Sequence, residues 1–260
     1  MPDPAPQPER DLRIVLIGTS HPGNVGAAAR AMQTMGLDAL HLVAPQCDPF
    51  SETAHAMAAG AERVMSALRV HDTLDQAIGD CLLVFGATAR RRSVALQESV
   101  PREAAAKLFD AAAQGGAALL FGRERTGLEN HELQRCHGAV HIPSDPAFGS
   151  LNLAAAVQVL AYELRLAQLA GDTAAPVEPS RRSEPPASQA DMERFFEHLS
   201  QTLVDIDFHK GRHDVILMQR LRRLFLRAAP DMRELRILRG ILGESQRMAR
   251  LAGQNVERED

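Results

Sequence analysis

The segment AALLFGRERTG, residues 117–127, places a solid run of apolar residues directly before a polar loop that contains glycine. Apolar runs without polar alternation are typical of strands that are covered on both faces of a sheet. Similar runs occur at residues 13–18 (RIVLIG) and 82–86 (LLVFG), and further strands are expected at residues 39–43, 68–70 and 139–142. Helices are expected between them, at residues 24–35, 51–59, 73–79, 101–114 and 150–170. The first part of the chain is therefore predicted to have an α/β fold.

The composition changes at residues 171–189, GDTAAPVEPSRRSEPPASQ, which are rich in Pro, Ser and charge and have no hydrophobic periodicity. Such a segment buries too little apolar surface to order itself, and we expect a flexible linker. Three amphipathic helices are predicted beyond it. Their apolar positions are Phe195, Phe196, Leu199 and Leu203, then Ile216, Leu217, Leu221, Leu224 and Phe225, then Leu235, Leu238, Ile241 and Leu242.

Composition and simple motifs exclude several functional classes. The formal net charge of the 260 residues is −4, so any contact with nucleic acid must come from local clusters of basic residues. The three cysteines are widely spaced and odd in number, which excludes a disulfide framework and a CxxC zinc site, and we interpret them as buried thiols. The sequence has no GxGxxG after its first predicted strand, and no GK[ST], HExxH or GxSxG. These absences leave a dinucleotide site, a P-loop, a zincin site and a nucleophile elbow without support from the sequence. No signal peptide is recognised, and we expect a soluble, cytoplasmic protein without a metal.

Polar and glycine residues follow four of the predicted strands, at residues 19–24, 87–90, 123–127 and 143–152. In open α/β sheets, ligands bind at the carboxyl ends of the strands. These four loops are therefore expected to converge on one pocket.

Three segments carry a more specific signal: HPGNVGAAARAMQTMGL (residues 21–37), LLFGRERTGLENHEL (119–133) and IPSDPAFGSLNLAAAVQVLAYEL (142–164). In this order they resemble the three motifs of the SPOUT superfamily (SpoU/TrmH-like) of RNA 2′-O-ribose methyltransferases, and the resemblance covers nearly all of residues 11–170. The opening HPGN and the later RLRRLF (220–225) and LRILRGIL (235–242) resemble the branch of bacterial tRNA anticodon-loop ribose methyltransferases. Ala87 and Gly149 depart from that pattern, because a hydroxyl residue is commoner at both positions.

The resemblance implies a parallel sheet with a C-terminal trefoil knot, an exception to the general absence of knots, plus a small all-α C-terminal domain. It also implies a homodimer whose active sites contain residues of both subunits, and the cofactor S-adenosylmethionine, bound largely by backbone groups. By position, the cofactor site is expected at Ala87, Thr88, Ala89, Gly122, Ile142, Gly149, Ser150 and Leu151. The implied domains are a catalytic and dimerisation domain (11–170), the linker (171–189) and an RNA-binding domain (190–260).

The expected catalytic residues are Arg30, Ser150 and Asn152. Arg30 matches the arginine of the first motif, and because a guanidinium is a poor base we assign it phosphate clamping. Asn24 and Glu124 are expected to bind RNA or to support the site, Glu124 by pairing with an arginine. Each also has a structural interpretation: a surface arginine for Arg30, a helix N-cap for Asn24 and Asn152, and a solvated charge cluster for Glu124.

Residues 208–250 contain eleven Lys and Arg against four acidic residues. Arg220, Arg223 and Arg227 have the spacing of one helix face, opposite the apolar stripe, and we expect them to bind RNA phosphates. We interpret the run of arginines at residues 90–92 either as a solvated surface or as a second phosphate contact.

From the resemblance, the expected reaction is 2′-O-methylation of the pyrimidine (cytidine or uridine) at position 32 of tRNA. The alternatives are ribose methylation of ribosomal RNA and a non-catalytic RNA-binding protein with the same fold.

Overall fold

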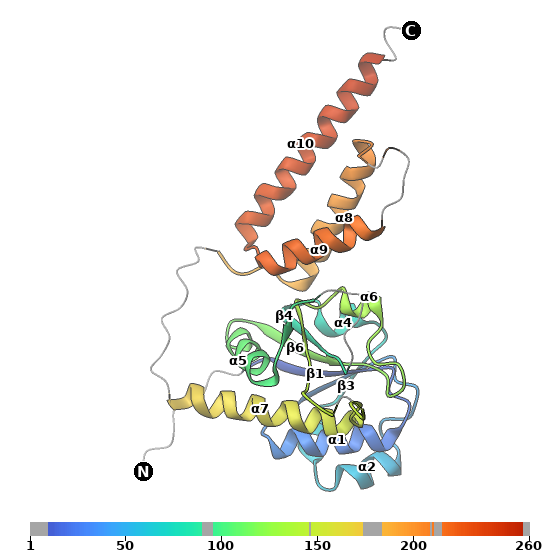
Figure 1. Cartoon of the computed structure of the whole chain (residues 1–260), viewed down its shortest axis with the longest axis vertical. Helices are drawn as coiled ribbons and strands as arrows, with labels where there is room; N and C mark the ends of the chain where they lie inside the picture. Colours follow the sequence, from blue (N-terminus) through green and yellow to red (C-terminus); the bar gives the residue numbers. More distant parts are fainter. Residues whose placement is uncertain are drawn as a thin grey trace. The chain divides into compact units, whose positions relative to one another are not determined.

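A computed structural model describes residues 10–89, 96–145, 147–173, 184–208, 210 and 215–256. The chain divides into two compact units, Met1–Glu178 and Pro179–Asp260 (Figure 1). The arginine run at residues 90–92, which the sequence offered as a phosphate contact, lies outside the described residues, as do residues 174–183 of the predicted linker.

A seven-stranded sheet forms the centre of the first unit, and every strand pair in it is parallel. The strand order is β3-β2-β1-β6-β4-β7-β5. The bounds are β1 Leu12–Ile17, β2 Ala39–Val43, β3 Arg69–His71, β4 Cys81–Ala87, β5 Glu98–Ser99, β6 Gly116–Phe121 and β7 Gly138–Val140. The predicted α/β fold is thus confirmed, and β5 is a strand that the sequence interpretation missed.

Helices cover both faces of this sheet. Ile14 and Leu16 of β1 belong to a core shared with α1, α5 and α7, whereas Val15 and Ile17 belong to a second core shared with α4 and α6. This double burial explains why the strand sequences are solidly apolar. The helices are α1 Pro22–Thr34, α2 Glu52–Ala58, α3 Glu62–Ala67, α4 Leu74–Ile78, α5 Pro101–Ala112, α6 Asn130–Leu133 and α7 Leu153–Thr173.

Local signals in the sequence set several helix ends. Thr73 and Gln76 form a capping box at the start of α4, and Pro101 occupies the first turn of α5. Within the described residues, α7 is the one helix whose length and hydropathy would allow it to cross a membrane. One such helix is weak evidence for a membrane span, because the core helix of a globular protein passes the same test, and α7 packs against α1 and α5.

The second unit contains three helices, α8 Gln189–Asp205, α9 Val215–Ala228 and α10 Met232–Val256. The four apolar positions predicted for α8 are all buried in its core. The prediction was wrong for Ile216 and Leu224 of α9 and Ile241 of α10, which are 59%, 48% and 58% exposed. The core of a small three-helix unit can bury only a narrow apolar stripe of each helix. Residues at the margins of a wider stripe therefore stay exposed.

The predicted linker is shorter than residues 171–189. Helix α7 extends to Thr173, and Gln189 is the first residue of α8. Before α8, Ala187 is buried and its N–H donates to the carbonyl of Pro230 (3.2 Å), while Ser188 caps the helix. The end of this polar segment is therefore held by backbone hydrogen bonds that composition does not reveal.

Candidate active site

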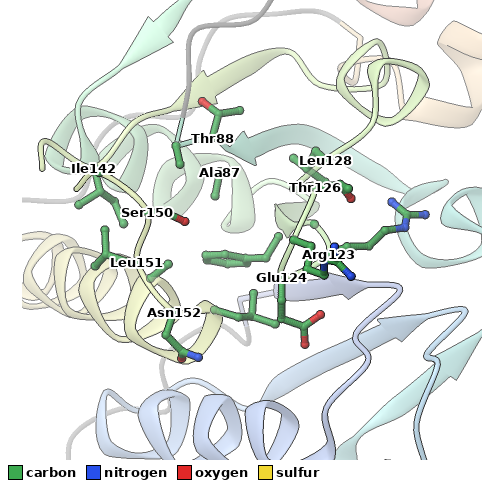
Figure 2. A pocket seen from close by; sticks show the side chains of 18 of the residues that line it. Ala87, Thr88, Arg123, Glu124, Thr126, Leu128, Ile142, Ser150, Leu151 and Asn152 are labelled. Atoms are coloured by element: carbon green, nitrogen blue, oxygen red, sulfur yellow. The ribbon is translucent and has the colours of Figure 1, made fainter. Parts of the chain in front are cut away.

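A cavity of about 410 Å³ opens at the carboxyl ends of β4, β6 and β7 (Figure 2). Figure 2 shows Ile142, Ser150 and Leu151 on one side of it and Arg123, Glu124 and Thr126 on the other. All eight residues that the sequence assigned to the cofactor line this single cavity, together with Glu124 and Asn152. Parallel pairing accounts for this convergence, since it brings the carboxyl ends of the strands to one edge.

Backbone hydrogen bonds fix the loop after β4. The N–H of Thr88 donates to the carbonyl of Val140 (2.9 Å), and the carbonyl of Thr88 lies 3.0 Å from Nδ1 of His141. Residues 87–89 are thereby tied to the end of β7, so that two walls of the cavity form one structure.

The loop after β6 turns back on itself at Gly122. A Cβ atom on Gly122 would lie 2.1 Å from the carbonyl carbon of Gly127 and 2.1 Å from the nitrogen of Leu128, so only glycine permits this approach. Within the loop, the N–H of Gly127 donates to the carbonyl of Arg123 (2.8 Å). The guanidinium of Arg123 pairs with buried Glu132 (3.0 Å), which anchors the loop to α6.

Residues 142–152 form the third wall and lead into α7. The Ser144 hydroxyl donates to the carbonyl of Gly149 (3.0 Å). Oδ1 of Asn152 accepts from the N–H groups of Ala154 (2.9 Å) and Ala155 (3.4 Å). Asn152 therefore caps α7, as its structural interpretation predicted.

Four polar side chains form a connected network beside the cavity. The Glu124 carboxylate accepts from the Asn24 amide (2.9 Å), from the Ser20 hydroxyl (3.0 Å) and from the Ser20 N–H (3.3 Å). Nδ2 of Asn152 donates in turn to Oδ1 of Asn24 (3.1 Å). Because a carboxylate only accepts, Glu124 fixes which way both amides point. The network joins the loops after β1 and β6 to the start of α7.

Glu124 is ionised at neutral pH. Partial burial raises the pKa of its carboxyl group, but the hydrogen bonds from Asn24, its own backbone and Ser20 outweigh burial and leave that pKa below the ordinary value. The expected pairing of Glu124 with an arginine was wrong: within the described residues its partners are Asn24 and Ser20, and Arg123 is drawn away by Glu132.

Asn24 differs from its structural interpretation as a helix cap, whereas Arg30 matches its interpretation as a surface arginine within its own chain. Asn24 is not the N-cap of α1, because His21 accepts from the N–H of Gly23 (3.1 Å) in that role, and the side chain of Asn24 is free for the network. Arg30 is exposed two turns further along α1 and does not line the cavity of its own chain. Among the described residues, no side chain pairs with its guanidinium.

The sequence interpretation missed Ser20 and Arg125 as parts of the site. Ser20 was visible as a polar residue after β1, but nothing in the sequence indicated that it would bind Glu124. Arg125 lines the cavity, is exposed and has no ion-pair partner in the part of the chain that the structure describes. It supplies a positive charge at the entrance that is available to an anionic ligand.

The three arginines predicted on α9 are not equivalent. Arg220 and Arg227 are exposed, whereas Arg223 is half-buried and makes a contact within the protein. Neighbouring Arg222 binds Glu193 through two hydrogen bonds (2.6 and 2.7 Å) and stacks on Phe196. Exposed Ile216 and Leu224 lie on the same side as Arg220, so the face is mixed rather than purely basic.

The cysteines and histidines show no second centre. Cys81 and Cys136 are buried as predicted, and burial raises the pKa of the Cys81 thiol to about 12, whereas Cys47 is only partly buried. Among the residues that the structure describes, no three His, Cys, Asp or Glu side chains are grouped in a way that could hold a metal ion.

Comparisons with known proteins give two family matches. The model of the SpoU rRNA Methylase family matches residues 11–162, and that of the tRNA methyltransferase TrmJ C-terminal domain matches residues 190–254. The chain is 47% identical to the tRNA (cytidine/uridine-2′-O-)-methyltransferase TrmJ of Pectobacterium atrosepticum over 91% of this chain and 97% of that enzyme. It is also 47% identical to the tRNA (cytidine/uridine/adenosine-2′-O-)-methyltransferase TrmJ of Pseudomonas aeruginosa, over 96% and 98%.

Among solved structures, TrmJ from Z. mobilis ZM4 superimposes with a TM-score of 0.74 and 34% identity, covering 89% of this chain and 97% of that one. A probable methylase family protein from Haemophilus influenzae gives a TM-score of 0.59 and 39% identity over 94% and 99%. The similarity therefore spans both compact units.

Proposed function

Since the chain belongs to the SpoU rRNA methylase family and its relatives over almost its whole length are tRNA 2′-O-methyltransferases, we propose that it methylates a ribose 2′-hydroxyl of tRNA, at the pyrimidine of position 32 in the anticodon loop. As an RNA ribose methyltransferase it would act in the cytoplasm, where tRNA is processed.

One observation carries the choice of tRNA. The match to a TrmJ-type C-terminal domain at residues 190–254 accompanies the catalytic match in the same chain. The motifs of residues 11–162 alone would suit ribosomal RNA equally well. The intact network of Asn24, Glu124 and Asn152 favours an enzyme over a non-catalytic RNA-binding protein, because its side chains are ordered around an open cavity.

The cavity fits S-adenosylmethionine in size and chemistry. Its volume lies in the range of small-ligand pockets, and its walls combine apolar side chains such as Ile142 and Leu151 with backbone groups and the Thr88 and Ser150 hydroxyls. When bound, the cofactor supplies an electrophilic methyl group on a sulfonium. The residues that would hold it are those assigned from the sequence, and Gly122 permits the tight fold of the loop that forms one cavity wall.

The polar network orients the groups around the attacking ribose. Glu124 accepts from three donors in its ionised form, and a carboxylate with a lowered pKa is a weak base, so we assign it positioning. Asn24 and Asn152 each keep one amide hydrogen for a substrate oxygen, because their other hydrogen is used within the network. Ser150 offers a hydroxyl at the cavity wall. Holding the ribose in line for displacement is the main contribution of these residues.

We assign Arg30 to the cavity of a partner subunit in a homodimer. Helix α7 presents an outward apolar stripe in which Tyr162 and Leu169 are 49% and 46% exposed, and α1, which carries Arg30, packs beside α7. A second copy would cover this stripe and would bring Arg30 to a site other than its own. There its guanidinium would clamp a phosphate next to the target ribose.

Mixing two inactive chains tests this assignment. Arg30→Ala removes the clamp, and Leu151→Trp blocks the cavity. If Arg30 serves the partner's cavity, random pairing of the two variants restores about a quarter of the wild-type sites. If Arg30 serves its own cavity, the mixture stays inactive, and this part of the proposal fails.

The second unit is proposed to bind the body of the tRNA through Arg220, Arg223 and Arg227, with the linker joining it to the catalytic unit. We also propose that the segment from β7 to α7 threads through the fold as a trefoil knot. The sheet order supports this, because β7 lies between β4 and β5, two strands that precede it in the chain.

Methyl transfer to two RNA classes tests the proposed function. The purified protein is incubated with labelled S-adenosylmethionine and either unmodified tRNA or ribosomal RNA. Label in the ribose of tRNA supports the proposal. Label in ribosomal RNA alone would replace the substrate, and absence of cofactor binding would favour a non-catalytic RNA-binding protein.

A further inference from the structure

Phe148 is the most exposed large apolar side chain in the described part of the chain, at 86%. It lies in the loop between β7 and α7 and directly precedes Gly149, Ser150 and Leu151, which line the cavity. Phe148 itself is not a lining residue. Its ring is therefore displayed to solvent one residue away from the cavity wall.

Short-range hydrogen bonds build the turn that displays this ring. The N–H of Phe148 donates to the carbonyl of Asp145 (3.0 Å), and the N–H of Ala147 donates to the Asp145 carboxylate (2.7 Å). The Ser144 hydroxyl closes the turn on the carbonyl of Gly149. The outward position of Phe148 is thus set by a defined turn that leaves the ring without a partner in the core.

The surroundings of Phe148 favour a flat ligand over a protein partner. Burial of a phenylalanine side chain stabilises a folded protein, and the exposed position of Phe148 forgoes that contribution. A protein interface would need further apolar side chains around the ring, but its chain neighbours Asp145, Ala147, Gly149 and Ser150 are polar or small. The nearest large apolar residue in the chain after Phe148 is Leu151, which lines the cavity. A single exposed ring beside a ligand cavity is suited to an unstacked nucleobase, which proteins that bind single-stranded RNA commonly stack on an aromatic side chain.

We propose that Phe148 is the stacking platform for the base of the target nucleotide. The base is attached to the ribose carbon next to the one that bears the 2′-hydroxyl, so when this hydroxyl enters the cavity the base remains close to the cavity wall. Stacking on Phe148 holds it there, and Arg125 at the cavity entrance attracts a neighbouring phosphate. Every base has a π face, so this contact accepts cytidine, uridine and purines alike. The inference rests on the proposed function, since it requires single-stranded RNA as substrate.

Three substitutions at Phe148 test stacking separately from apolar contact. Phe148→Ala and Phe148→Leu remove the π face, and Phe148→Tyr keeps it. As a control, Val70→Ala removes another exposed apolar side chain (49%) from the far edge strand β3. We expect the Ala and Leu variants to lose about 5- to 150-fold in kcat/KM for tRNA, the equivalent of one stacked base. The Tyr and Val70 variants should match the wild type, and the Kd for S-adenosylmethionine should be unchanged in all four.

A binding measurement reports on stacking without catalysis. An anticodon stem-loop with 2-aminopurine at the target position should lose fluorescence on binding wild-type protein and keep it on binding Phe148→Leu. Equal quenching by both proteins, wild-type kcat/KM in Phe148→Leu, or a parallel loss of cofactor affinity would overturn the inference. Failure of the proposed function is distinct, because the wild type itself would then leave tRNA unmethylated.

Discussion

Replacing Glu124 by alanine should lower turnover much more than it lowers the free energy of unfolding. The substitution removes the acceptor of three donors: the N–H and hydroxyl of Ser20, which are exposed, and the amide of Asn24, which is half-buried. In the variant, water can accept the hydrogen bonds of the exposed Ser20 groups in place of the carboxylate. A hydrogen bond to a charged group contributes about 1.5–3 kcal/mol when water is excluded. Water reaches the Asn24 pair, so we expect a loss of about 1 kcal/mol, or about 2–4 °C in the Tm of a unit of this size.

The expected effect on turnover is much larger. Without Glu124, the amides of Asn24 and Asn152 lose the acceptor that sets their direction, and displacement by about 1 Å costs about 100-fold in rate. This equals about 2.7 kcal/mol, more than twice the loss in stability. Glu124→Gln should lose less, because its oxygen can still accept from Asn24 while its NH₂ donates to the Ser20 hydroxyl.

Thermal unfolding and methyl transfer to tRNA, measured on the same preparations, test this contrast, with Glu103→Ala as an exposed carboxylate control. Full turnover in Glu124→Ala would refute the positioning role. Equal losses in stability and turnover would also refute it, because they would indicate partial unfolding. Since the pKa of Glu124 is lowered in the folded protein, the stability advantage over Glu124→Gln should be complete above the ordinary carboxyl pKa of 4.5 and disappear as pH falls through the lowered value.

Three further perturbations address the rest of the chain. Gly122→Ala should lower the free energy of unfolding by about 3 kcal/mol or more, because the new Cβ meets backbone atoms at 2.1 Å. Calorimetry should show loss of S-adenosylmethionine binding while the protein is still folded, and unchanged affinity would contradict the described loop. Burial lowers the pKa of both His41 and His137 to about 4, so these two rings together should bind about two protons on unfolding near pH 5. Their contribution should lower the free energy of unfolding by about 2.7 kcal/mol for each unit by which the pH falls there, and a flat profile would show that these rings are hydrated. Neutralising Arg220 and Arg227 together should reduce the slope of log Kd for tRNA against log salt by about 1–2, and an identical slope would remove α9 from the RNA interface.

Most of the sheet was predictable because its strands are buried on both faces. Strand β2 was predicted at its observed bounds, Ala39–Val43, and β1, β4 and β6 lie within one residue of theirs. The sequence interpretation missed β5, whose two residues Glu98 and Ser99 have no apolar run and depend on pairing with β7. It also missed α3 and α6, of six and four residues, since helices this short have no measurable period.

The cavity was predictable to a greater extent than the contacts around it. The positions of polar loops after the predicted strands indicate that Thr88 and Ser150 lie at one pocket, and the family resemblance adds Gly122 to it. The partners of Glu124 depend on side-chain direction across residues separated by 100 positions or more, which no local pattern encodes. The alternative interpretation of Asn24 as a helix cap was wrong, because His21 caps α1 instead.

The location of the methyl group tests the central claim most directly. Unmodified tRNA is treated with the wild-type protein and S-adenosylmethionine, digested with nucleases and analysed by mass spectrometry. The account predicts a 2′-O-methyl pyrimidine at position 32, absent with Arg30→Ala although that variant still binds the cofactor. A methyl group on a base, or on a ribose outside the anticodon loop, would contradict it.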